Sequence, residues 1–234
     1  MQKGKLYLVP VTIGGNLNES IPRANLEIIN NIEYFIVENI KTAVSFLKQG
    51  GITKKLDELH FYTFSKKIQE NDLSLYLKPA LNGNNMALMS ESGTPCIADP
   101  GEEIVMLAHE LGIKVVPLVG PSSIILSLMA SGLNAENFSF NGYLPISKNN
   151  RMRKIKELEK KIFNENQTQI FIEAPQRNDR LIDDILDICN GTTKLCIAKN
   201  ITMSDEHIET KTIQSWKKSK IIQGKNPVIF LLGR

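Results

Sequence analysis

The stretch MALMSESGTPCIADPGEEIVMLAHELGIKVVPLVG, residues 86–120, decides the fold class of this protein. It begins and ends with short apolar runs of strand length. Between them lies a helical pattern that closes at Gly112, since glycine commonly terminates helices. A strand, a helix and a second strand in this order predict a crossover between parallel strands.

The loop SESGTPCIADPG, residues 90–101, is too elaborate for a plain turn. Gly93 and Pro95 surround Thr94, so the loop offers backbone amides and one hydroxyl in a fixed geometry. Asp99 lies three residues before Glu102, and this spacing predicts a capping box at the start of the helix. We therefore divide the loop into a ligand-facing half, SESGTP, and a helix start, ADPG.

The same alternation of strands and helices fills the first half of the chain, with one of the helices expected at residues 71–83. Regular alternation predicts a mostly parallel sheet, in which ligands bind beyond the carboxyl ends of the strands. Distinctive loops follow three such ends, at residues 10–17, 90–99 and 119–123. The strands are expected at residues 5–11, 34–38, 58–64, 85–90 and 114–120.

The second half has fewer helices and more closely spaced strands, which indicates a mixed sheet. The sequence therefore predicts two α/β domains, residues 1–118 and 119–234. The strands of the second domain are expected at residues 137–145, 194–202, 208–216 and 226–233, with one more at the start of the stretch 168–191.

Composition excludes several classes of protein. The chain is 42% apolar and 23% charged, which is ordinary for a folded domain. Its three cysteines include no C-x-x-C pair, and its histidines are scattered, so we expect no disulfide, no metal site and a cytoplasmic location. No apolar run is long enough to cross a membrane. The P-loop, the G-x-G-x-x-G fingerprint and the G-x-S-x-G elbow are all missing from the sequence.

The net charge of +3 does not by itself indicate a nucleic-acid partner. The stretch SKNNRMRKIKELEKK, residues 147–161, nevertheless holds seven Lys and Arg against two Glu. It is either a solvated helix face or an arm that contacts phosphates. Ser122 likewise either caps a helix or, with Ser123, offers a helix N-terminus to an anionic ligand.

Several stretches together resemble the tetrapyrrole (corrin/porphyrin) methylase superfamily, and within it the branch of bacterial 16S rRNA 2′-O-ribose (cytidine) methyltransferases. The resemblance extends from residue 5 to residue 233. It implies S-adenosylmethionine bound in a cleft between the two domains, a homodimer, and ribosomal RNA or the small ribosomal subunit as partner. The stretches are LYLVPVTIGGNL, ALMSESGTPCIADPG, LGIKVVPLVGPSSIILSLMASGL, FSFNGYLP, TQIFIEAPQR and KNPVIFLLG.

Individual residues are candidates for roles in this activity, and those for contact with the cofactor are carried over by position from the resemblance. The candidates for a catalytic base, all at predicted strand ends, are Glu38, Glu173 and Lys199. The candidates for contact with the RNA are Lys41, Arg151, Arg153 and Arg177. The candidates for contact with the cofactor are Pro10, Glu91, Ser92, Thr94, Ile97, Ser123, Ile124, Ile172 and Ala198.

The chain departs from that branch on the acceptor side. Where that branch has EDTR, this chain has ENIK (38–41), and where the branch has ESPHR, this chain has EAPQR (173–177). In the same way, KNITM (199–203) stands in place of RELTK, and GKNPVIF (224–230) stands in place of KGEF. The sequence also ends without the further C-terminal helical segment of that branch. We expect a methyltransferase of a ribose 2′-OH in small-subunit rRNA. The alternatives are a methyltransferase of the same fold with a small molecule or another target, and a cofactor-binding protein without this activity.

Overall fold

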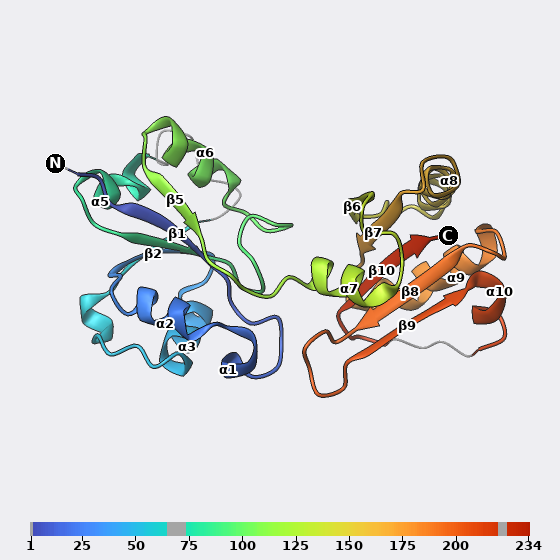
Figure 1. Cartoon of the computed structure of the whole chain (residues 1–234), viewed down its shortest axis with the longest axis horizontal. Helices are drawn as coiled ribbons and strands as arrows, with labels where there is room; N and C mark the ends of the chain where they lie inside the picture. Colours follow the sequence, from blue (N-terminus) through green and yellow to red (C-terminus); the bar gives the residue numbers. More distant parts are fainter. Residues whose placement is uncertain (1, 65–73, 220–223) are drawn as a thin grey trace. The chain divides into compact units, whose positions relative to one another are not determined.

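The computed structural model describes residues 2–64, 74–219 and 224–234 (Figure 1). The chain forms two compact units, Met1–Ser122 and Ser123–Arg234. The observed boundary lies four residues beyond the one expected from the sequence. We describe each unit by itself.

The N-terminal unit contains a five-stranded parallel sheet with strand order β3-β2-β4-β1-β5. The central strand β1 pairs with β4 on one side, where Leu6 lies opposite Met86, and with β5 on the other, where Leu6 lies opposite Val115. The strands are β1 (Lys5–Val9), β2 (Tyr34–Val37), β3 (His60–Thr63), β4 (Met86–Met89) and β5 (Lys114–Pro117).

Helices cover both faces of this sheet, as Figure 1 shows for α2 and α3 on one side and α5 and α6 on the other. Successive strand residues point to opposite faces, so Val9 and Phe35 pack into one core cluster while Leu6 and Ile36 pack into another. The part of the predicted helix 71–83 before residue 74 lies outside the described residues. The helices are α1 (Leu17–Ser20), α2 (Arg23–Ile29), α3 (Ile40–Gln49), the 3₁₀ turn η1 (Leu56–Glu58), α5 (Lys78–Leu81) and α6 (Glu102–Glu110).

The strand order places a topological switch point between β1 and β4. The chain leaves β1 toward β2 on one side of the sheet, and it leaves β4 through α6 toward β5 on the other side. Adjacent strands whose connections diverge in this way leave a crevice at their carboxyl ends, where ligands of open parallel sheets bind. The loops that follow β1 and β4 are therefore the first place to look for a site.

The C-terminal unit contains a mixed five-stranded sheet with strand order β6-β7-β10-β8-β9. Strands β6 and β7 are parallel, while β10 runs antiparallel to β7 and β8, and β9 antiparallel to β8. The strands are β6 (Phe138–Tyr143), β7 (Thr168–Ile172), β8 (Lys194–Lys199), β9 (His207–Thr212) and β10 (Val228–Gly233).

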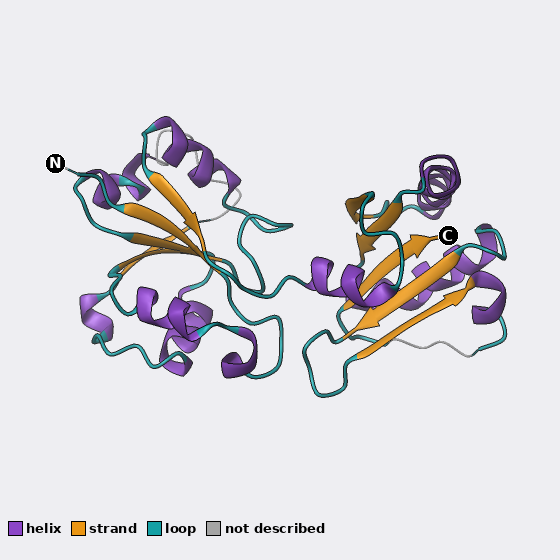
Figure 2. Cartoon of the chain, in the orientation of Figure 1, coloured by secondary structure: helices purple, strands orange, loops and turns teal. Residues whose placement is uncertain are grey.

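The two faces of the mixed sheet have different covers (Figure 2). Phe171, Phe230 and Trp216 belong to a core cluster formed with α8, α9 and α10. Helix α7 packs on β10, β9 and β8, and on this side a Cβ at Gly233 would lie 2.9 Å from Leu133 Cδ2. The helices are α7 (Ser123–Ser131), α8 (Lys148–Glu165), the 3₁₀ turn η2 (Pro175–Arg177), α9 (Asn178–Ile188) and α10 (Ile213–Trp216).

Three local predictions were wrong. The N-cap of α6 is Gly101, with a φ of 128° and no side-chain cap, so Asp99 does not form the predicted capping box. The strand expected at residues 208–216 ends at Thr212, whose side chain caps the short helix α10. The stretch TIGGNLNESIP, residues 12–22, which its Gly and Asn content predicts to be a loop, contains the short helix α1, because the Asn16 side chain accepts a hydrogen bond from the Asn18 amide.

Candidate functional site

Three loops meet at the carboxyl ends of β1, β4 and β5. The Val11 amide donates to the Gly93 carbonyl at 2.9 Å, which joins the loop after β1 to the loop after β4. A Cβ at Gly93 would lie 3.0 Å from Ile13 Cγ2, and one at Gly120 would lie 2.2 Å from the ring of Pro10. The Pro10 ring lies so close to the backbone of residue 120 that only glycine fits there without movement.

The loop after β4 holds an unusual backbone. Within residues 93–101, φ is positive at Gly93, Cys96, Ala98 and Gly101. A left-handed conformation costs an ordinary L-residue roughly 1–2 kcal/mol, and Cys96 and Ala98 both adopt it. Strain of this kind persists where the surrounding structure fixes the loop, and it is concentrated at ligand sites.

The predicted cofactor residues of this loop remain open to a ligand. Glu91 and Ser92 are exposed, Thr94 is half-buried, and Ile97 leaves 54% of its surface exposed. Pro10 is buried against the position of Gly120. The structure therefore places these five residues of the N-terminal unit on loops at the switch point, with an apolar side chain available at Ile97.

The end of β2 adds Glu38 to the same edge of the sheet. The Glu91 amide lies 3.4 Å from Glu38 Oε1, and the Thr42 hydroxyl lies 3.4 Å from Glu91 Oε1. Asn39 accepts from the Lys41 amide at 2.9 Å and thereby caps α3, while Lys41 itself is exposed. Because Asn and Asp are equivalent N-caps, Asn39 in place of Asp preserves the start of this helix.

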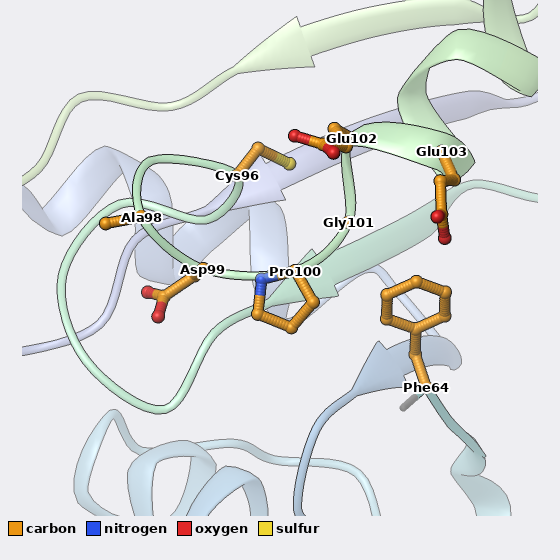
Figure 3. A pocket seen from close by; sticks show the side chains of 8 residues that line it. All are labelled: Phe64, Cys96, Ala98, Asp99, Pro100, Gly101, Glu102 and Glu103. Carbon is orange, nitrogen blue, oxygen red and sulfur yellow. The ribbon is translucent and has the colours of Figure 1, made fainter. Parts of the chain in front are cut away.

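A pocket of about 490 Å³ lies beside the second half of the loop after β4, which begins at Cys96 (Figure 3). Figure 3 shows the Glu103 carboxyl group directed toward the Phe64 ring, with the Pro100 ring nearby. None of the cofactor residues predicted from the sequence lines it, so the segment interpreted only as a helix start forms a pocket wall. The lining residues are Phe64, Cys96, Ala98, Asp99, Pro100, Gly101, Glu102 and Glu103.

In the C-terminal unit, the structure brings two predicted cofactor residues into one cross-strand row. Ile229 of β10 pairs with Ile172 of β7 on one side and with Ala198 of β8 on the other. Residues directly opposite each other in a sheet point to the same face. Ala198 is fully buried within this unit. Ser123 and Ile124 form the first turn of α7, and Ile124 is buried.

Glu173 follows β7 and is tied to a neighbouring arginine. Its Oε1 accepts from the Ala174 amide at 2.7 Å and from Arg177 Nε at 2.9 Å, and Arg177 Nη2 also binds it. The Glu173 side chain is only 1% exposed, whereas that of Arg177 is 27% exposed. Glu173 therefore does not fit the role of catalytic base, because it is buried and already neutralised by a guanidinium.

Two of the segments that depart from the rRNA branch are joined at one end of this sheet, together with Asn178, which directly follows a third. Asn178 Nδ2 donates to the Asn226 carbonyl at 2.8 Å, and Asn200 Nδ2 donates to Asn226 Oδ1 at 3.2 Å. The Oδ1 atoms of Asn178 and Asn200 are buried and have no hydrogen-bond partner within the described part of the chain. Lys199, at the end of β8, directly precedes Asn200 and is half-buried.

Helix α8 carries the basic stretch, and it separates the two arginines predicted to bind RNA. Arg151 is 7% exposed, with its Nε donating to Asp184 Oδ2 at 2.7 Å and its Nη1 donating to the Ile146 carbonyl at 2.7 Å. Arg151 therefore does not fit the role of a phosphate contact. Arg153 is exposed on the other side of the helix, where its Nη2 donates to Asn150.

Sequence reasoning missed two further cations of α8. Lys156 and Lys160 are exposed and lie three and seven residues after Arg153, so all three share one face of the helix. Lys154, by contrast, binds Glu157 at 2.8 Å. The helical period of the stretch was the available signal, because it assigns Arg151 and Arg153 to different faces.

The remaining polar chemistry of the site is modest. Burial raises the pKa of the Cys96 thiol to about 11, with smaller contributions from Glu102 and Asp99.

Over the described ranges, no group of three or more His, Cys, Asp and Glu side chains could hold a metal ion. Of the helices that the structure describes, none has both the length and the apolar character needed to cross a membrane.

The fold and these loops define an α/β protein of two units with a ligand crevice at a parallel-sheet switch point. The same fold occurs in the methyltransferase CobJ, with a TM-score of 0.64 at 11% identity over 99% of this chain and 94% of that one. It also occurs in uroporphyrin-III-C-methyltransferase from Thermus thermophilus, with a TM-score of 0.57 at 17% identity over 100% and 93% of the two chains.

Three relatives share more of the sequence, and each is a ribosomal RNA small subunit methyltransferase I. The protein of Vibrio cholerae is 35% identical over 87% of this chain and 67% of its own length. That of Buchnera aphidicola is 33% identical over 99% and 76%, and that of Escherichia coli is 30% identical over 98% and 78%.

The chain matches the Tetrapyrrole (Corrin/Porphyrin) Methylases over residues 5–216, and it belongs to this family. It is therefore a methyltransferase that uses S-adenosylmethionine as its methyl donor. The match includes both groups of predicted cofactor residues, from Pro10 in the first loop to Ala198 in β8.

Proposed function

We propose that this methyltransferase modifies a ribose 2′-OH of small-subunit ribosomal RNA. The observation that carries the proposal is the similarity to three ribosomal RNA small subunit methyltransferases I across 87–99% of the chain. The exposed cations of α8 support it, because RNA binding depends largely on contacts between Lys or Arg and phosphates.

We infer that the cofactor contacts come from two groups of residues, and the N-terminal group fits this ligand. Close packing at Gly93 and Gly120 fixes the loops, while Thr94 offers a hydroxyl and Ile97 an exposed apolar surface for the adenine. The proposed set is Pro10, Glu91, Ser92, Thr94 and Ile97 in the first unit, and Ser123, Ile124, Ile172 and Ala198 in the second.

The cofactor supplies an already activated methyl group, so the protein has only to orient the acceptor and remove its proton. We propose Glu38 or Lys199 as the group that accepts the proton of the 2′-OH. Glu38 lies at the switch-point edge next to Glu91, and Lys199 is half-buried at the end of β8. The contacts of Glu173 with Arg177 leave it out of this role.

For the RNA contacts we propose Lys41, Arg153 and Arg177, to which the structure adds Lys156 and Lys160. Lys41, Arg153, Lys156 and Lys160 are exposed, and Arg177 is partly so. Arg151 is excluded because its guanidinium is bound to Asp184 and to backbone carbonyls. We further propose that the protein works as a homodimer in the cytoplasm.

The test uses purified protein, labelled S-adenosylmethionine and small ribosomal subunits isolated from a strain lacking this gene. We expect label in the rRNA and the loss of one ribose methylation from the 16S rRNA map of that strain. Reactions with subunits from the wild-type strain are the control, since their target is already methylated. Cofactor binding without incorporation into subunits, together with an unchanged map, would show that the acceptor is another molecule.

A further inference from the structure

The Glu173–Arg177 pair gives the C-terminal unit an arginine of fixed orientation. Two different donors of Arg177, Nε and Nη2, bind the single oxygen Glu173 Oε1. The same oxygen also accepts from the Ala174 amide. A guanidinium held through two of its nitrogens cannot rotate about its last bonds, because its donors form a rigid planar fork.

Arg177 keeps donors available for a second partner. A guanidinium has five N–H groups, and those bound to Glu173 account for only part of them. Its side chain is 27% exposed, while the Glu173 carboxylate is 1% exposed. The carboxylate of the pair is therefore buried, while the remaining N–H donors of Arg177 are accessible to solvent.

The segment that carries Arg177 is fixed on both sides. Before it, Glu173 directly follows β7, and after it, Asn178 is fully buried and donates to the Asn226 carbonyl at 2.8 Å. The Asn200 amide in turn donates to the Pro227 carbonyl at 3.0 Å. The position of the Arg177 backbone is thus set by the ends of three strands, β7, β8 and β10.

We propose that Arg177 binds a phosphodiester oxygen of the RNA substrate and that Glu173 is its positioning residue. This inference rests on the proposed function. Leaving a carboxylate buried beside β7 without its guanidinium would be strongly unfavourable, so the pair also keeps Arg177 in place when no RNA is bound. A planar fork prepared in this way can offer two N–H groups to a phosphate, which a lysine at this position does not reproduce.

The experiment measures the affinity for a 16S rRNA fragment, its salt dependence and the cofactor affinity in Arg177→Ala, Arg177→Lys, Glu173→Gln and the double variant Glu173→Gln/Arg177→Ala. We expect Arg177→Ala to weaken RNA binding by about 10- to 100-fold and to reduce the salt slope by about 0.7–0.9. Arg177→Lys keeps the charge but should recover only part of the affinity. Cofactor affinity should stay within twofold of the wild type.

The double variant tests the positioning role. If Glu173 acts through Arg177, the double variant binds RNA no more weakly than Arg177→Ala alone, and the two single effects are not additive. A purely structural pair would lower the midpoint of thermal unfolding and leave the salt slope unchanged, which would overturn the proposal. A loss of cofactor affinity in place of RNA affinity would also overturn it, since the anion would then be the cofactor carboxylate.

These outcomes are separable from a failure of the proposed function. If the wild-type protein methylates rRNA and Arg177→Ala binds RNA normally, only the present inference fails. If the wild-type protein binds the cofactor but neither binds nor methylates rRNA, the proposed function fails and this inference falls with it. Arg180 is exposed and lies in α9, three residues after Arg177. The variant Arg180→Ala is therefore the matched control and should behave like the wild type.

Discussion

The guanidinium of Arg151 lies against the carboxylate of Asp184, with Nε 2.7 Å from Oδ2, and so joins α8 to α9. Their side chains are 9% and 5% exposed. Removal of one partner from a buried ion pair leaves the other charge unpaired in the interior. The most basic-looking stretch of the sequence therefore contains one cation that stabilises the fold and others that face solvent.

We expect Arg151→Ala to lower the free energy of unfolding by about 3–5 kcal/mol, measured by urea denaturation. The affinity of the folded variant for RNA should not change. Arg153→Ala, two residues away and exposed, should change the free energy of unfolding by less than about 0.5 kcal/mol. An unchanged urea midpoint in Arg151→Ala, combined with weaker RNA binding, would contradict this assignment.

Neutralising the exposed face of α8 should weaken RNA binding. The triple variant Arg153→Gln/Lys156→Gln/Lys160→Gln removes three cations that lie on one side of the helix. If all three contact phosphates of a single strand, the salt slope falls by about 2 and the affinity by about 100-fold at 0.1 M salt.

The control for this variant removes the same charge elsewhere. Lys48, Lys55 and Lys114 are exposed cations of the N-terminal unit, and their replacement by Gln gives the same net charge. We expect the control to bind RNA nearly as tightly as the wild type. Equal losses in both triple variants would mean that net charge, and not the face of α8, governs the affinity.

A methyl group at residue 120 should damage the cofactor loops. A Cβ on Gly120 would lie 2.2 Å from two ring atoms of Pro10, and a proline ring cannot rotate away. We expect Gly120→Ala to weaken S-adenosylmethionine binding by about tenfold or more, since a shift of the loop misplaces the residues that orient the ligand. Isothermal titration calorimetry measures this directly.

Gly191→Ala provides the matched control, because the nearest atom to its added Cβ would be Gln214 Cβ at an ordinary 3.6 Å. Its cofactor affinity should equal that of the wild type. If Gly120→Ala also binds the cofactor normally, the loops after β1 and β5 do not take part in the site.

The Cys96 thiol should react slowly despite its partial exposure. Its pKa of about 11, against an ordinary 9.0, is raised chiefly by burial. Only the thiolate reacts, so alkylation by iodoacetamide at pH 8 should be about 100-fold slower than for an unperturbed thiol. The rate should rise about tenfold per pH unit up to pH 11, followed by mass spectrometry of the peptide that contains Cys96.

The same pKa sets the direction of a pH effect on stability. The unfolded thiol ionises near pH 9 while the folded one stays protonated, so its stabilising contribution is complete below pH 9 and is lost as the pH rises toward 11.

Protein unfolded in guanidinium chloride is the control for the alkylation rate. Rapid modification of folded Cys96 at pH 7 would show that the loop opens readily.

The sequence by itself determined the class of fold, and it predicted the loops that we propose to carry the site. Short apolar runs of strand length and helical runs of period 3.6 are local properties, so they predicted the parallel sheet of the N-terminal unit and the mixed sheet of the second. The glycine and proline content of residues 90–101 likewise indicated a ligand loop, because glycine allows a left-handed backbone and proline fixes φ wherever they occur.

Only the tertiary structure decided which charged groups are free to act. Asp184 lies 33 positions from Arg151, and Asn226 lies 48 positions from Asn178, and no local pattern encodes such pairs. Glu173 and Arg177 are close in sequence, yet their roles depend on burial, which the packing of neighbouring strands sets. Whether a charge binds a ligand or stabilises the fold depends on its partner and its access to water, and long-range packing determines both.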